Sequence, residues 1–168
     1  LVVKDVTCVD RMGTTVLDNI SFTAKGGEIL GIAGIAGSGQ RELLEAIAGL
    51  QNLSSGEILY KNPKNNEIVN LMDKSPLQIR DLGVRLSFVP EDRLGMGLVG
   101  SMDITDNMML RSYRKGHSLF VDRKKPKDLA EEIIESLEVV TPGVGTPVRR
   151  LSGGNVQKVL VGREIAAS

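Results

Sequence analysis

An apolar run followed by closely spaced glycines and a helical pattern constrains this chain most. Residues 28–33 read Glu-Ile-Leu-Gly-Ile-Ala and are nearly all apolar, which is typical of a parallel β-strand buried on both faces. Three glycines follow within 34–39, and apolar side chains then recur at helical spacing over 43–47. The order of strand, glycine loop and helix predicts an α/β fold in which the loop opens a helix.

The glycine loop is suited to bind an anion, because glycines let backbone N–H groups close around phosphate oxygens and the helix dipole favours negative charge. The pattern G-x-x-x-x-G-K-[ST] places its glycines on Gly34 and Gly39, but its lysine falls on Gln40 and its hydroxyl residue on Arg41. The dinucleotide pattern G-x-G-x-x-G fails, because its third glycine falls on Glu42. The sequence indicates a phosphate loop without its usual side chains. A tight turn without a ligand is the alternative.

Composition restricts the classes of function that remain. Lysine plus arginine and aspartate plus glutamate number 21 each, so no basic excess favours non-specific binding to nucleic acid or acidic membranes. Aromatic residues make up 3%, which leaves few side chains to stack on bases. Cys8 is the single cysteine and His117 the single histidine, so we expect no internal disulfide and no metal site. No apolar stretch approaches the roughly 20 residues of a membrane-spanning helix.

Short alternating patterns predict a small antiparallel sheet beside the main one. Residues 2–6 and 20–24 form two short strand-like runs separated by a turn-rich segment at 10–13, and the run 57–60 is expected to join them. The polar cluster 61–66 contains proline and three asparagines, as expected for the tip of a hairpin. We therefore expect these three segments to pair.

A second strand with acidic residues at its end is expected in the middle of the chain. Ser75–Gln78 has the pattern of a capping box with proline at the first helical position, and Gly83 ends that helix. The segment 84–88 alternates and predicts a strand. Glu91 and Asp92 follow it, and ligands in open α/β sheets bind beyond the carboxyl ends of strands, so both could meet a metal or an attacking water. A surface acidic turn is the alternative.

The pattern becomes helical over 102–140. Thr105 or Asp106 is expected to cap a first helix, and Pro126 is expected to open a second, whose apolar residues recur at helical spacing. Proline and glycine are frequent over 141–147, which predicts a hinge-like linker.

The stretch Leu-Ser-Gly-Gly-Asn at 151–155 is the second informative feature. Ser152 is a good helix cap, yet two glycines follow, and glycine costs about 1 kcal/mol relative to alanine in a helix interior, less in a first turn. A helix that served stability alone would not begin this way. Bare N–H groups beside a hydroxyl at a helix start offer a second anion site.

With both stretches in view, the chain resembles the ATP-binding domain of ABC transporters over its whole length. LSGGN is similar to the signature motif of that family. More narrowly, GIAGIAGSGQREL, FVPEDR and LSGGNVQKVLVGREI are similar to the second, C-terminal ATP-binding half of tandem proteins that energise bacterial sugar and nucleoside importers. The forms GSGQREL and VTPGVGTPVRRLSGG resemble the nucleoside importers of this group more than the sugar importers. Because the chain starts without methionine and stops within a helical pattern, we expect a C-terminally incomplete piece of a longer protein.

The resemblance implies a fold and a set of partners. The fold is α/β: a P-loop NTPase (RecA-like) core with a flanking antiparallel β subdomain over 1–100, an α-helical subdomain over 101–150, and the signature with the start of its helix over 151–168. Two such domains dimerise head to tail, here with a partner ATP-binding domain in the same parent chain. Membrane permease subunits contact the helical subdomain, and a solute-binding protein acts indirectly. The resemblance places the protein peripherally at the cytoplasmic face of the cell membrane, without nucleic acid.

The resemblance also assigns a nucleotide site to the chain's own loop. Lysine normally meets the β and γ phosphates and the hydroxyl residue holds magnesium, and Gln40 and Arg41 do not reproduce both roles. We expect this loop to bind ATP weakly or not at all and not to hydrolyse it. Glu91 stands at the position of the family's Q-loop glutamine. The loop residues are Gly34, Ile35, Ala36, Gly37, Ser38, Gly39, Gln40 and Arg41.

The resemblance implies a second nucleotide site, which this chain's signature completes on the partner domain. The signature faces the γ-phosphate on the partner's intact loop, and donors aimed at developing charge are a large catalytic term. The signature residues are Leu151, Ser152, Gly153, Gly154, Asn155 and Gln157. The family's acidic pair and switch histidine are expected after Ala167, so this piece holds no catalytic residue or metal ligand and should be inactive alone. ATP and magnesium belong to the parent complex.

Two rival hypotheses remain open on the sequence. In the first, Arg41 substitutes for the lysine and the parent domain hydrolyses ATP in its own loop. In the second, the chain is a non-transport ABC ATPase that acts on DNA or ribosomes, which the neutral charge and the lack of basic arms disfavour.

Overall fold

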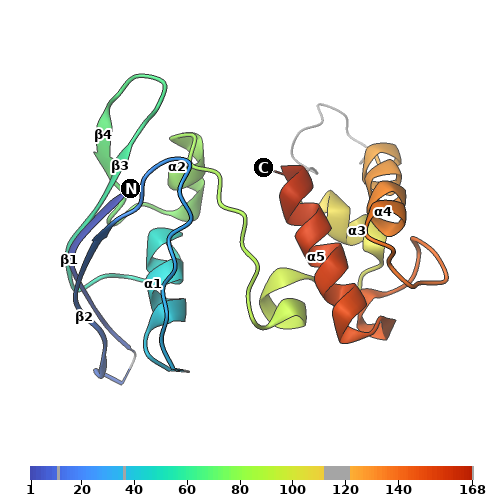
Figure 1. Cartoon of the computed structure of the whole chain (residues 1–168), viewed down its shortest axis with the longest axis horizontal. Coiled ribbons are helices and arrows are strands. Elements are labelled where there is room, and N and C mark those ends of the chain that lie inside the picture. Colours follow the sequence, from blue (N-terminus) through green and yellow to red (C-terminus); the bar gives the residue numbers. More distant parts are fainter. Residues whose placement is uncertain (11, 36, 112–121, 168) are drawn as a thin grey trace. The chain divides into compact units, whose positions relative to one another are not determined.

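The computed structural model describes residues 1–10, 12–35, 37–111 and 122–167, so Ala36 and His117 lie outside the described residues. The chain divides into two units, Leu1–Leu86 and Ser87–Ser168. The first unit contains a sheet and two helices, and the second is helical (Figure 1). Each unit has its own hydrophobic core.

An antiparallel sheet in the order β2-β1-β3-β4 forms one layer of the first unit. Its strands are β1 (Val2–Val9), β2 (Thr15–Thr23), β3 (Ser55–Lys61) and β4 (Ile68–Asn70). Val3 on β1 lies opposite Phe22 on β2 and Ile58 on β3. The predicted antiparallel pairing and hairpin tip are confirmed, although β2 begins earlier than its pattern indicated.

Two helices, α1 (Gln40–Ile47) and α2 (Pro76–Asp81), cover one face of this sheet (Figure 1). The predicted capping box of α2 is confirmed: Gln78 N donates to Ser75 Oγ (3.4 Å), and Ser75 N donates to Gln78 Oε1 (2.8 Å). The core between helices and sheet consists of Val3, Val6, Cys8, Leu17, Leu43, Ala46, Ile58, Leu71 and Ile79.

The predicted buried strand over 28–33 is wrong. The segment forms no strand, and Ile29, Leu30 and Ile32 are exposed, Ile29 completely. The predicted strand over 84–88 is also not formed. A parallel strand exists only when neighbouring strands pair with its N–H and C=O groups, and in the described ranges neither run belongs to the sheet. The antiparallel β subdomain of the predicted α/β fold is present, whereas in the described residues the expected parallel strands are not formed.

In the described residues of the second unit, three α-helices pack with two short turns of other helix types. Its elements are the π-helix η1 (Arg93–Gly97), α3 (Ile104–Met109), α4 (Lys124–Ser136), the 3-10 helix η3 (Val148–Arg150) and α5 (Gly153–Ala167). α4 packs against both α3 and α5, and η1 packs against α5. Their shared core consists of Leu98, Ile104, Met108, Ala130, Ile133, Val139, Val148, Val156, Val159 and Leu160.

The helix boundaries differ from the predicted ones in two places. α3 is capped by Asp103, whose carboxylate accepts from Asp106 N at 2.7 Å, and Thr105 is buried in the first turn. Capping by Thr105 or Asp106 is therefore wrong. α4 begins before Pro126, which lies in the first turn, where its missing N–H costs nothing.

The proline- and glycine-rich segment 141–147 is packed rather than hinge-like. Ile104 N donates to Val144 O at 3.1 Å, and Val148 N donates to Met102 O at 3.1 Å. These bonds join the segment to the start of α3. Of the helices in the described part of the chain, none is long and apolar enough to cross a membrane.

Candidate functional site

The glycine loop lies at the start of α1 in the first unit. Gly39 precedes the helix with φ 85°, and a Cβ there would lie 2.4 Å from Val16 O on β2. Only glycine fits this position, because both the left-handed backbone and the close approach exclude a side chain. A glycine cap has no side chain with which to satisfy the first-turn N–H groups, so the helix start keeps the character of an anion site.

The polar side chains of this loop bond to the chain itself. Gln40, at the lysine position, donates from Nε2 to Ile32 O at 3.0 Å. Ser38 Oγ donates to Ile35 O at 2.7 Å. Arg41 Nε donates to Glu45 Oε1 at 2.7 Å, one helical turn along α1. The groups expected to approach a phosphate or magnesium are thus engaged within the loop and its helix.

The two acidic residues after Pro90 have different surroundings. Asp92 accepts from Gly95 N at 2.9 Å and caps η1, so it serves the local structure. Glu91 remains exposed. Over residues 1–10, 12–35, 37–111 and 122–167, no three histidine, cysteine, aspartate or glutamate side chains gather as a metal site would require.

The signature stretch forms the start of α5 in the second unit. Ser152 Oγ accepts from Asn155 N at 3.4 Å and from Asn155 Nδ2 at 3.0 Å. Asn155 Oδ1 accepts in turn from Val140 N at 3.1 Å. Asn155 therefore joins the cap of α5 to the segment that follows α4, which holds this helix start in place.

The start of α5 is exposed to solvent. Ser152, Gly153, Gly154 and Gln157 are exposed, whereas Leu151 packs partly against the core. A Cβ on Gly154 would meet no atom within 4 Å. No residue in the described part of the chain therefore requires glycine at that position, and the bare backbone is accessible to a group from another molecule or domain.

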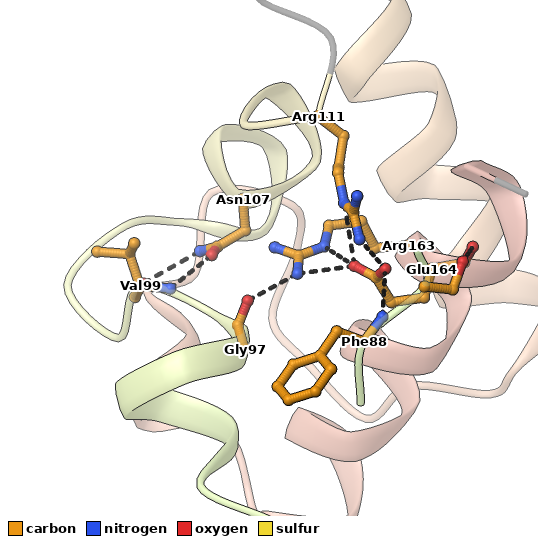
Figure 2. Close-up of polar contacts among 8 residues, drawn as sticks. Phe88, Gly97, Val99, Asn107, Arg111, Arg163 and Glu164 are labelled. Carbon is orange, nitrogen blue, oxygen red and sulfur yellow. Dashed lines mark hydrogen bonds and ion pairs between the residues drawn. The ribbon is translucent and has the colours of Figure 1, made fainter. Parts of the chain in front are cut away.

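A cluster of buried charges that the sequence analysis missed lies further along α5. Glu164 is 2% and Arg163 7% exposed, and both are grouped with Arg111 (Figure 2). Burial lowers the pKa of Arg163, and the adjacent Glu164 carboxylate opposes that shift. A signal was available, because Arg163 continues the i, i+3, i+4, i+7 spacing of the apolar face that starts at Val156.

The predicted site residues are distributed over both units. The loop over 34–41 belongs to the first unit, and Glu91 and the signature belong to the second. Within the second unit, the structure brings the segment after Pro90 next to the signature, because Arg93 Nη1 lies 3.6 Å from where a Cβ on Gly153 would stand.

An antiparallel sheet, a glycine loop that opens a helix, and a helical unit whose last helix begins at a bare Ser-Gly-Gly together define an ATP-binding cassette. The chain belongs to the ABC transporter family, whose model matches residues 17–168. Solved cassettes share its fold. The dimeric structure of a post-hydrolysis state of the ATP-binding cassette MJ0796 bound to ADP and Pi covers 99% of this chain at a TM-score of 0.77 and 23% identity, using 69% of its own length.

Among proteins of known sequence, the chain is similar to ATP-binding proteins of sugar and nucleoside import. The chain is 38% identical to the ribose import ATP-binding protein RbsA 1 of Rubrobacter xylanophilus over 99% of its length and 32% of the relative's. It is 37% identical to the guanosine import ATP-binding protein NupO of Bacillus subtilis, over 98% and 31%. It is 35% identical to the glucose import ATP-binding protein TsgD13 of Haloferax volcanii, over 97% and 29%. The chain thus spans about a third of the length of these relatives.

Proposed function

We propose that this chain is part of the ATP-binding subunit of a sugar or nucleoside importer, and that its signature completes the ATP site of a partner ATP-binding domain. The exposed start of α5 carries this proposal. A side chain at position 154 would meet no atom of the described residues, so packing within the chain does not explain the glycine, whereas the approach of a partner's phosphate would. The relatives named above are import proteins for ribose, guanosine and glucose, which supports a sugar or a nucleoside as the solute.

The signature is chemically suited to a phosphate. Ser152 Oγ accepts twice from Asn155, so its own hydrogen can be donated outward, next to the N–H groups of Gly153 and Gly154. Donors fixed in advance at a helix start stabilise charge that develops on a phosphoryl group. Leu151 anchors the stretch and Gln157 lies on the same exposed turn. In the parent complex, ATP and magnesium would be bound by the phosphate loop of the partner domain.

The chain's own loop is proposed to bind ATP weakly or not at all. Gln40 offers no positive charge, and its amide is turned toward Ile32 O. Arg41 is a donor that cannot ligate magnesium, and its pairing with Glu45 supports a structural role. The rival in which Arg41 replaces the lysine would require this pair to open. We propose no catalytic residue within this piece.

The proposed function also assigns roles to the other segments of the chain and to its partners. Residues 1–100 act as the nucleotide lobe, 101–150 as the helical subdomain that meets permease subunits, and 151–168 as the signature segment. Glu91 occupies the Q-loop position. The partner domain lies in the same parent chain, for which this chain is the second half, and a solute-binding protein acts through the permease. The parent complex works at the cytoplasmic face of the membrane.

The test uses the full-length protein and the change Ser152→Arg, which would fill the partner's phosphate site. We expect ATP turnover to fall at least about 100-fold, as when a transition-state donor is lost. Ser136→Arg, at the exposed end of α4, is the matched control and should retain turnover. Gln40→Ala should also retain it. Equal damage from Gln40→Ala and Ser152→Arg, or turnover that survives loss of the partner loop's lysine, would refute the assignment.

A further inference from the structure

The Glu164 carboxylate is a junction of three separate parts of the second unit. Phe88 N donates to Oε2 at 3.2 Å. Arg111, just after α3, contacts Oε2 through Nη2 and donates from Nε to Oε1 at 3.2 Å. Arg163 Nη2 lies 2.9 Å from Oε1 (Figure 2). One buried side chain on α5 therefore connects the helix to the segment before Pro90 and to the end of α3.

The segment 87–97, which contains Glu91, is attached to α5 at both of its ends. Ser87 Oγ donates to Glu164 O at 3.1 Å, and Arg163 Nη2 donates to Gly97 O at 2.6 Å. A Cβ on Gly97 would lie 2.9 Å from Leu160 Cδ2, which shows how closely this backbone approaches the helix. The segment is thus fastened to α5 before and after Glu91.

This use of charge is not explained by stability alone. A buried ion pair is often no better for stability than apolar residues of the same volume, since desolvation offsets the attraction. Here the charges hold backbone groups: Phe88 N–H by Glu164 and Gly97 C=O by Arg163. Apolar side chains could fill the same volume but could not hold those two groups in register with α5.

We propose that Glu164 is a positioning residue that couples the segment 87–97 to α5, so that Glu91 and the signature at the start of the helix move as one body. The coupling itself follows from the contacts within the second unit. Its effect on ATP turnover rests on the proposed function, because the signature then acts on a partner's ATP.

The first test is hydrogen exchange of the full-length protein with Glu164→Gln, which keeps the side-chain shape and removes the charge. We expect amides over 87–97 to exchange about tenfold faster, in line with usual coupling energies. The adjacent loop 98–103 should be unchanged, because Asn107 holds it through Val99. Asp106→Asn is the matched control, since it removes a carboxylate from the partly exposed pair with Arg123, at the capped start of α3.

The second test adds ATP. In the wild type, ATP should change the protection of amides from hydrogen exchange both over 87–97 and at the start of α5. In Glu164→Gln, ATP should change it only at the start of α5. Turnover should show kcat reduced about tenfold with KM unchanged, because ATP is bound by the partner's loop. A merely structural role would lower stability without separating these two responses. Glu164→Asp, which keeps the charge, should restore part of kcat.

The outcomes separate the two proposals. If wild-type protein neither binds nor turns over ATP, the proposed function fails, and the exchange measurement without nucleotide still tests the coupling. If ATP is turned over but 87–97 exchanges equally in wild type and Glu164→Gln, the coupling is overturned. Should Glu164→Gln not fold, Ser87→Ala removes only the outer hydrogen bond and must still raise exchange over 87–97, or the inference is wrong.

Discussion

Gln40 and Ser152 stand at two helix starts and use their side chains in opposite ways. The Gln40 amide is bonded to Ile32 O within its own loop. The Ser152 hydroxyl accepts from Asn155 N and Nδ2, and Ser152 is exposed. Under the proposed function, the missing charge weakens phosphate binding at the first site, whereas the exposed backbone at the second site can meet a partner's phosphate.

Restoring the two missing side chains tests the chemistry of the loop. Gln40→Lys with Arg41→Thr regenerates the full phosphate-loop pattern, and a charge-assisted hydrogen bond contributes about 1.5–3 kcal/mol. We expect Mg-ATP affinity at this loop to rise at least about tenfold, measured by calorimetric titration with the partner's loop disabled. Gln40→Lys alone should gain less, because no hydroxyl would hold magnesium. Unchanged affinity in the double variant would show that the loop backbone, and not its side chains, prevents binding.

The helices and hairpins formed where local signals were strong. The capping box of α2, the antiparallel hairpin of β3 and β4, and the start of α5 at Gly153 agree with their sequence patterns. Segments without strong caps were harder to predict. The cap of α3 is Asp103 because its carboxylate reaches the first-turn N–H of Asp106, and several polar residues nearby could have competed for that role.

The crossing of α4 and α5 depends on a small residue. A Cβ on Gly162 would lie 2.8 Å from Ile133 Cγ2 and 3.0 Å from Cγ1. Alanine adds helix propensity of about 1 kcal/mol, but overpacking costs about 1–3 kcal/mol, so we expect Gly162→Ala to lower the free energy of unfolding by about 1 kcal/mol. Urea titration measures this change.

The control for that prediction is a double-mutant cycle. In an Ile133→Ala background only the close approach to Leu137 Cδ1 (3.1 Å) remains, so Gly162→Ala should cost less than it does in the wild type. Gly154→Ala, whose Cβ has open space, should not reduce stability. An equal loss from Gly162→Ala with and without Ile133 would contradict the packing explanation.

The two units of the chain have separate cores, and damage to one core should remain within its unit. Ile58 is buried in the first core and Leu160 in the second. Replacing either with alanine should cost about 2–5 kcal/mol. Hydrogen exchange should then show faster opening in the first unit for Ile58→Ala and in the second for Leu160→Ala. Loss of protection across both units from either change would show that they unfold as one.

Local patterns in the sequence were sufficient for the features made within a few residues: the glycine loop, the signature, the capping box and the hairpin tip. Those features depend on backbone conformation and on side chains close in sequence. Long-range pairing is different. The apolar run over 28–33 is not a strand, because no described strand pairs with its backbone. Glu164 acquires its role from Phe88 and Arg111, far away in the chain, and only tertiary packing brings such groups into contact.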